Sequence, residues 1–386
     1  MRGIYTHLSV SSRHLTSLIP IYLTSILRSS IAKMDALPGD LVLAIAEQLD
    51  VKSALKLAGT CKHISSVIRA YERSVVLTRM KSFLYPPVGN VLSSELCLRR
   101  PLRHGSFEMM KELERRESAV EDILTKAPVY INIRSPAMLG DLDDESQIRL
   151  SGLLKRALAQ CDHIADIAAN APCKPKEKHW YLNLNRRYWE IPDLAWGFRE
   201  KDPYTNYSAR PYQREHIQSL PLEEVVMLLY LVTALSLGFL ESMAGFIDSD
   251  PAVFERTTMF EDSVLRHGSW FIWAHAVGGT EWQRMSMKIV TVALVELSDY
   301  ESGREDALPG LRSALLERFK ELTIIDEDTI PRMFTMAKRI VTGKDPWPEE
   351  DPEEDDAEGS GDESGGEGGS EDGDVDSDEN GVEDSN

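Results

Sequence analysis

Residues 37–69 read LPGDLVLAIAEQLDVKSALKLAGTCKHISSVIR, and this stretch decides the expected fold of the N-terminal part of the chain. Its first large apolar residues recur every four positions, at Leu37, Leu41, Ile45 and Leu49. That spacing places them on one face of a helix. Pro38 suits the first helical turn, where the missing N–H group costs nothing. The sequence therefore predicts a short helix with an apolar stripe.

Two more short helices are predicted directly after it. Asp50 ends the first run, and Ser53 is expected to cap the second helix through its hydroxyl group. The apolar positions of these helices are Leu55, Leu57 and Ala58, then Ile64 and Ile68. A unit of roughly thirty-five residues cannot bury a stable core alone. We therefore expect it to pack against a partner as well as against its own chain.

The joint pattern resembles an F-box, which has Leu-Pro, an acidic residue, spaced Leu and Ile, an Asp-containing turn, and a helix ending near Cys and a basic residue. The matching positions are Leu37-Pro38, Asp40, Leu41, Ile45, Leu49-Asp50, Leu55 and Cys61-Lys62. The resemblance covers less than a tenth of the chain and departs from the family at His63-Ile64, where an aromatic residue often follows. The alternative is an ordinary helical hairpin that begins with Leu-Pro.

The resemblance implies a substrate-receptor subunit of a cullin–RING ubiquitin ligase that docks on the Skp-type adaptor. The residues that it assigns to adaptor binding are Leu37, Pro38, Leu41, Ile45, Leu49, Leu55, Leu57 and Ile64. The rest of the chain would hold a protein substrate of unknown identity. Such a protein is not an enzyme and needs no catalytic residue, metal or cofactor, because it acts by tethering the substrate. The expected location is cytoplasmic, nuclear or both.

Charge is distributed unevenly along the 386 residues. Residues 345–386 hold 20 of the 63 Asp and Glu residues and no Lys or Arg, so the remaining 43 acidic residues balance the 43 basic ones. A neutral body gives no electrostatic argument for nucleic-acid binding. The acidic tail has too few apolar residues to fold and is expected to be disordered, with a basic partner as one possible use.

Four regions are expected from these patterns, in an all-α chain. Residues 1–33 contain no acidic residue and form an upstream extension, a disordered extension or a targeting segment. Residues 34–74 form the F-box-like unit, 75–344 an irregular helical substrate-binding domain, and 345–386 the disordered tail. Helical periodicity in the body is found at 106–125, 148–169, 223–246, 286–297, 311–322 and 329–342.

The run 225–240 is strongly apolar but shorter than the ~20 residues of a membrane span, so a buried central helix is expected and membrane insertion is not. Residues 179–212 are rich in aromatic residues and broken by three prolines, which indicates an ordered loop. Four cysteines without a C-x-x-C pair indicate a reduced, intracellular chain.

Two clusters of chemically capable side chains have an alternative role in packing. Cys161, His163, Cys173 and His179 are zinc-ligand types, but their spacing is not that of a zinc finger, and Cys161 fits an apolar helical stripe. The segment Trp270–His275 is rich in Trp and His, so it is either a helix with an aromatic packing face or the wall of a ligand site. A helical enzyme or ligand-binding protein with its site there is one alternative function. A nuclear interaction protein that uses its acidic tail against a basic partner is the other.

Overall fold

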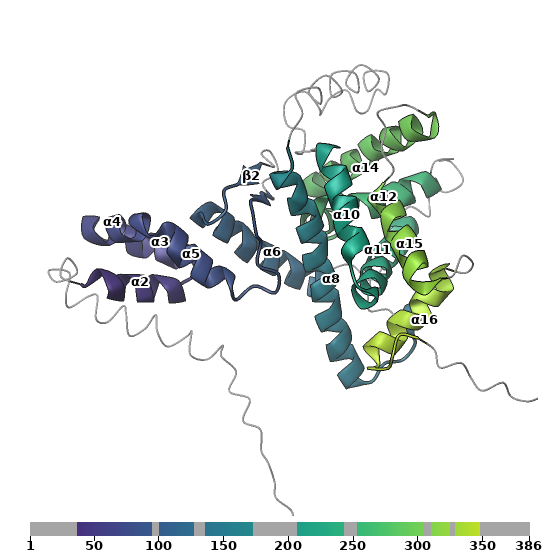
Figure 1. The fold of residues 1–386 in the computed structure, drawn as a ribbon, viewed down its shortest axis with the longest axis horizontal. Helices are drawn as coiled ribbons and strands as arrows, with labels where there is room; N and C mark the ends of the chain where they lie inside the picture. Colours follow the sequence, from purple (N-terminus) through teal and green to yellow (C-terminus); the bar gives the residue numbers. More distant parts are fainter. Residues whose placement is uncertain are drawn as a thin grey trace, which may run out of the picture. The chain divides into compact units, whose positions relative to one another are not determined.

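The structure is a computed structural model that describes residues 37–94, 100–126, 136–172, 207–242, 253–303, 310–324 and 329–347. The chain divides into two units, Met1–Pro346 and Trp347–Asn386. The described part of the first unit is almost entirely helical (Figure 1), which confirms the all-α class. Its two short strands, β1 (Val91–Leu92) and β2 (Pro101–Leu102), pair antiparallel. The predicted extension at 1–33 and nearly all of the acidic tail lie outside the described residues.

The first described segment contains the three short helices that the sequence predicts. They are α2 (Gly39–Gln48), α3 (Val51–Ala58) and α4 (Lys62–Ala70). A fourth helix, α5 (Glu72–Met80), follows at once and was not predicted. It crosses the expected domain boundary at residue 74 without a break. We refer to α2–α5 as the N-terminal unit.

The predicted cap of α3 was wrong in detail. Asp50, rather than Ser53, is the N-cap residue, because its backbone is extended while Ser53 already lies in the first helical turn. Asp50 Oδ1 accepts the backbone N–H of Ser53 at 2.8 Å. The hydroxyl group of Ser53 donates to Asp50 Oδ2 at 2.9 Å. The two residues therefore share the cap, with the carboxylate as its acceptor.

Two small apolar cores hold the N-terminal unit together. One joins α2, α4 and α5 through Val42, Ala46, Ile64, Ile68 and Val75. The other joins α3 and α5 to β1, β2 and α6 (Phe107–Lys126) through Val51, Val76, Met80, Val91, Leu102, Met109, Met110 and Leu113. Because α5 contributes to both cores, it connects the first helices to the remainder of the chain.

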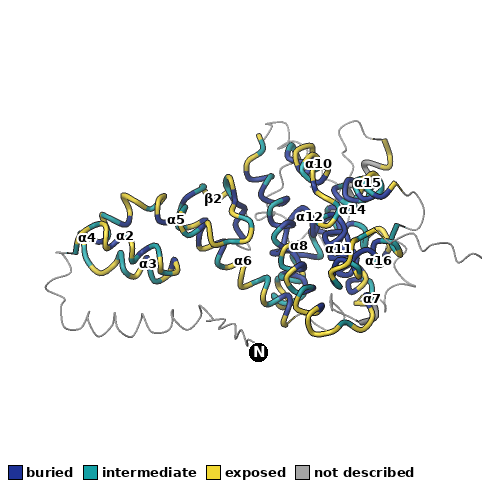
Figure 2. Tube along the Cα trace, turned by 60° about the horizontal axis from the view of Figure 1, so that its bottom comes forward, coloured by how far each residue is buried: buried dark blue, intermediate teal, exposed yellow. Residues whose placement is uncertain are grey.

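The helical body has one large core, and many of its buried residues belong to α8, α11 and α12 (Figure 2). Its elements are α7 (Pro136–Leu139), α8 (Asp144–Asn170), η3 (Tyr207–Ala209), α10 (Arg210–Ser219), α11 (Leu222–Ser242), α12 (Val253–His267), α13 (Ser269–Ala276), α14 (Thr280–Glu301), α15 (Leu311–Thr323) and α16 (Thr329–Val341). All six helices predicted for the body are present. Of the predicted loop at 179–212 only the last residues are described, and there Tyr212 lies inside α10 instead.

Helix α11 is the central helix that its composition predicts. It is buried on all sides over most of its length and packs against α8, α12, α15 and α16. Among the described residues it is the helix long and apolar enough to cross a membrane, yet 78% of its apolar window is covered by the protein itself. The helical body is thus built around one buried apolar helix.

Candidate functional site

The residues that the sequence assigns to partner binding fall into two groups in the N-terminal unit. Five of them form what we call the outer face, namely Pro38, Leu41, Ile45, Leu49 and Leu55. Leu41 and Leu55 are the most accessible of the large ones, with 48% and 49% of their surface exposed. Ile45 and Leu49 are half-buried, and Pro38 is exposed. These side chains leave apolar area accessible to solvent.

The other three assigned residues serve the interior of the unit. Ile64 is completely buried in the core between α2, α4 and α5, so it is not on the surface. Leu37 and Leu57 are half-buried and pack against the same core. Ile64 is therefore part of the interior of the unit, whereas Leu37 and Leu57 keep part of their surface accessible.

His63, at the position where the sequence departs from the family pattern, has a structural use. Its Nε2 atom lies 3.1 Å from the carbonyl oxygen of Leu37. A carbonyl oxygen only accepts, so Nε2 carries the proton in this contact. The bond ties the second residue of α4 to Leu37, which directly precedes the N-cap residue of α2. It holds the start of the outer face in place.

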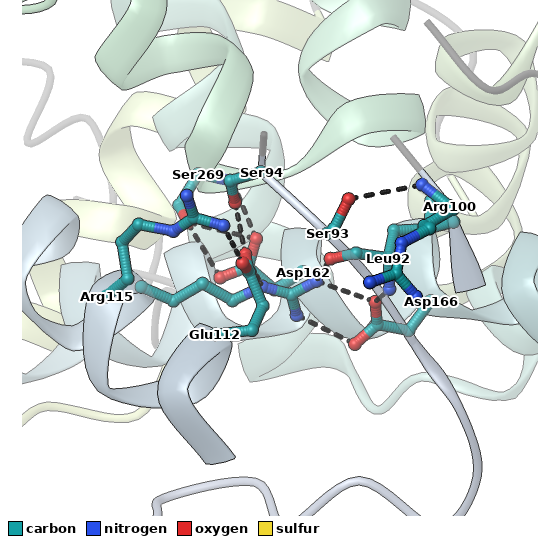
Figure 3. Close-up of polar contacts among 10 residues, drawn as sticks. Leu92, Ser93, Ser94, Arg100, Glu112, Arg115, Asp162, Asp166 and Ser269 are labelled. Atoms are coloured by element: carbon teal, nitrogen blue, oxygen red, sulfur yellow. Dashed lines mark hydrogen bonds and ion pairs between the residues drawn. The ribbon is translucent and has the colours of Figure 1, made fainter. Parts of the chain in front are cut away.

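A buried group of charged and hydroxyl side chains lies where β1, α6, α8 and α13 meet (Figure 3). The guanidinium of Arg116 binds Asp166 through two bonds of 2.8 Å and donates to the carbonyl oxygen of Leu92 at 2.7 Å. Asp166 in turn accepts the Leu92 N–H at 2.8 Å. Burial opposes the charge of Arg116, but the surrounding carboxylates, Asp166 foremost, raise its pKa above its usual value.

The remaining carboxylates of this group are bound as well. Asp162 accepts the Ser269 N–H at 2.8 Å and the Ser269 hydroxyl at 2.7 Å, and burial raises the pKa of Asp162. Glu112 accepts from Ser94, Arg115 and Arg116. Every charge is therefore matched by a donor or an opposite charge. We assign the group a structural use, which is to lock the four elements together.

A groove of about 610 Å³ lies between residues 83–87, α6 and α8. We call it the α6–α8 groove. Phe83, Leu84 and Tyr85 line one wall, while Glu114 and Glu117 line the α6 wall. Its volume is in the range of pockets that bind small molecules or side chains. Sequence reasoning missed this site, although the spacing of Glu114, Glu117 and Glu121 on a predicted helix was a usable signal of an acidic face.

The tryptophan and histidine side chains of the alternative site at Trp270–His275 lie in different places in the structure. Trp270 is buried, and Trp273 and Trp282 pack edge to face with ring centroids 5.3 Å apart beside a cavity of about 140 Å³. His275 does not line that cavity. Its ring lies among Phe239 and Phe260, its Nδ1 is 3.1 Å from the Ser286 hydroxyl, and burial lowers its pKa to about 4. The helix with an aromatic packing face, one of the two predictions, is the one that this geometry favours.

The zinc-ligand types separate in the same way. Cys161 is fully buried in the core of α8, as its apolar stripe predicts. The His163 ring packs against that of His216 at 4.7 Å. Cys173 and His179 lie outside the described residues, and within the described ranges no three His, Cys, Asp or Glu side chains come close enough to hold a metal ion.

Comparisons of this chain with protein-family models, with curated proteins and with solved structures find no match.

Proposed function

We propose that this protein is a substrate receptor of a cullin–RING ubiquitin ligase, in which the outer face of α2 and α3 docks on the Skp-type adaptor and the helical body holds the substrate. The observation that carries the proposal is the arrangement of apolar side chains on α2. Val42 and Ala46 fill the interior, while Leu41 remains about half exposed on the same short helix. A two-sided apolar helix is typical of an element that also packs against a partner.

The energetics of docking favour the outer face as the source of affinity. Leu41 and Leu55 each leave about half of their surface in water. Covering that area yields about 25 cal/mol per Å², from which the costs of association are subtracted. The half-buried Ile45 and Leu49 add to the same surface. Binding of micromolar strength or better then requires good shape complementarity at these few residues.

The mechanism that follows needs no chemistry from this chain. The receptor holds adaptor and substrate at once and thereby raises the local concentration of the substrate at the ligase. The buried polar group around Arg116 fits that use, since its charges are all matched and serve rigidity. Rigidity keeps the bound substrate at a constant place relative to the adaptor.

The test is co-purification of the full chain with a Skp-type adaptor after substitution of the outer face. Leu41→Asp combined with Leu55→Asp places two charges in the interface and should abolish binding, since an unpaired charge buried there costs several kcal/mol. Ile148→Asp is the matched control, because Ile148 is 75% exposed on α8, far from the outer face in the sequence. The proposal fails if the double variant still binds the adaptor as the control does.

A further inference from the structure

The α6–α8 groove combines an apolar wall with an acidic one. On the apolar side, Leu84 keeps 56% of its surface exposed next to Phe83 and Tyr85. On the α6 side, Glu114, Glu117 and Glu121 are spaced by three and four residues and so share a helical face. The two walls together can contact both an aliphatic side chain and a positive charge.

Most charges around the groove already have a partner. Asp166 is neutralised by Arg116, and Glu121 pairs with Lys155 at 2.9 Å. Glu114 accepts from Arg79 at 3.4 Å. These pairs leave the groove wall with little unmatched positive charge to repel a cationic ligand.

Glu117 is different, because no ion pair or hydrogen bond reaches it from the described residues. Partial burial, and then the like charge of Glu114, raises the pKa of Glu117. Partial burial also raises the pKa of Glu114. Arg79 offsets part of this like-charge repulsion, because its positive charge lowers the pKa of both carboxylates. A cation bound at Glu117 would relieve the repulsion that remains.

The arrangement of the carboxylates indicates which kind of cation the groove can bind. No group of three acidic or other metal-ligating side chains within the described ranges is close enough to bind a metal ion. A guanidinium or ammonium group on a flexible side chain can instead reach Glu117 and Glu114 in turn, and its hydrocarbon stem can lie on the apolar wall.

We propose that the α6–α8 groove binds a peptide segment that carries an Arg or Lys side chain beside an apolar residue. The cationic group lies against Glu117 and Glu114, and the apolar residue lies against Leu84 and Tyr85. This inference rests on the proposed function in so far as the bound segment belongs to a ligase substrate. Substrates recognised here would then be proteins with an exposed basic segment.

The experiment measures binding of the full chain to an arrayed library of peptides that have Arg, Lys, Gln or Glu at a central position and varied flanking residues. Wild-type protein should retain peptides with central Arg or Lys over those with Gln. Glu117→Gln should weaken binding of the best cationic peptide about tenfold, the value of one charge-assisted hydrogen bond. Glu117→Lys should shift the preference toward central Glu, which a merely structural residue would not do.

Glu145→Gln is the matched control, because Glu145 is an exposed carboxylate on α8 that pairs with Arg149 and does not line the groove. It should leave the peptide preference unchanged. The inference is overturned if wild-type protein shows no preference for cationic peptides, or if the preference survives in Glu117→Gln. Circular dichroism melts confirm that the variants fold.

Adaptor co-purification with the same variants separates this inference from the proposed function. Glu117→Gln should keep the adaptor, and the variant with Leu41→Asp and Leu55→Asp should keep the peptide preference. A chain that selects cationic peptides but never binds the adaptor would refute the ligase proposal and leave the groove assignment standing. The opposite result would refute the groove assignment alone.

Discussion

The backbone N–H of Val51 donates to the carboxylate of Glu114, 63 residues later, at 3.1 Å from Oε1 and 3.3 Å from Oε2. Val51 is the first residue of α3, so this N–H is one of those that a helix cannot satisfy internally. The negative charge also lies at the positive end of the helix dipole. Glu114 thus fastens the N-terminal unit to α6, and the same side chain lines the groove.

Removing this connection should loosen the N-terminal unit. Glu114→Ala leaves the Val51 N–H without its acceptor, and we expect a loss of about 1–2 kcal/mol in the free energy of unfolding, as for other lost helix caps. Chemical denaturation measures the change. Glu114→Gln keeps an acceptor oxygen and should lose less. Equal stability of the wild type and Glu114→Ala would contradict the assigned role.

Two adjacent arginines offer a matched comparison of buried and exposed ion pairs. Both bind Glu112, but the Arg116 side chain is 8% exposed and that of Arg115 is 44% exposed. Arg116→Met removes the cationic partner of the buried Asp166 and should cost about 3–5 kcal/mol, while Glu112 keeps Ser94 and Arg115. Arg115→Met should cost about 0–1 kcal/mol. Urea unfolding curves measure the two losses of stability, and the loss should be larger for Arg116→Met. A larger loss for Arg115→Met would show that the buried polar group does not stabilise the fold.

His275 should make the protein less stable in mild acid. Burial lowers its pKa from 6.5 to about 4, so the unfolded chain takes up a proton at a pH where the folded chain does not. The contribution of neutral His275 to the free energy of unfolding is complete above pH 6.5. It declines as the pH falls toward 4, by up to about 3 kcal/mol. In His275→Phe that part of the pH dependence of the unfolding free energy should disappear.

Ser286→Ala serves as the control for His275, because it removes the hydrogen-bond partner of Nδ1 and keeps the titrating ring. It should retain a decline of stability between pH 6.5 and 4. If His275→Phe and the wild type lose stability in parallel over this range, another group accounts for the acid sensitivity.

The acidic tail should be dispensable for folding and for adaptor binding. Arg339 donates to the carbonyl oxygen of Asp345 at 2.6 Å, so the chain is best ended after Trp347. The melting temperature of the shortened chain should match that of the full chain. Any partner bound through the tail should be basic, and its binding should weaken with salt, since charges are screened beyond ~8 Å at physiological ionic strength. Unchanged partners after deletion would leave only a role in solubility.

Helices with a clear apolar stripe were predictable from the sequence, and those with polar inner faces were not. Helix α8 follows its stripe of Leu and Ala, whereas α12 turns Glu261, Asp262 and Arg266 into the interior. A search for apolar periodicity assigns charged residues to the exposed face of a helix, so it does not detect α12. Helix α10 is polar along most of its length and gave no stripe either.

The candidate sites divide along the same line. The exposed apolar residues Leu41 and Leu55 lie on one continuous stretch, where the four-residue spacing of the stripe separates Leu41 from the buried Val42. Whether they contact a partner stays a prediction. Ile64 was misplaced because spacing shows that a helix has an apolar side without showing what covers it. The groove brings together Leu84, Glu117 and His163 from distant segments. No local sequence pattern predicts that these residues lie close together, because their proximity depends on how α6 packs.

Helix α6 therefore has an architectural consequence. Glu114 meets the N-terminal unit and Arg116 meets α8, two residues or about 3 Å apart along one helix. So short a span leaves no room for a hinge between the two attachments. If the N-terminal unit and the helical body each bind a partner, α6 therefore fixes the distance between the two attachment points. A change within α6 is then what would alter the separation of the two partners.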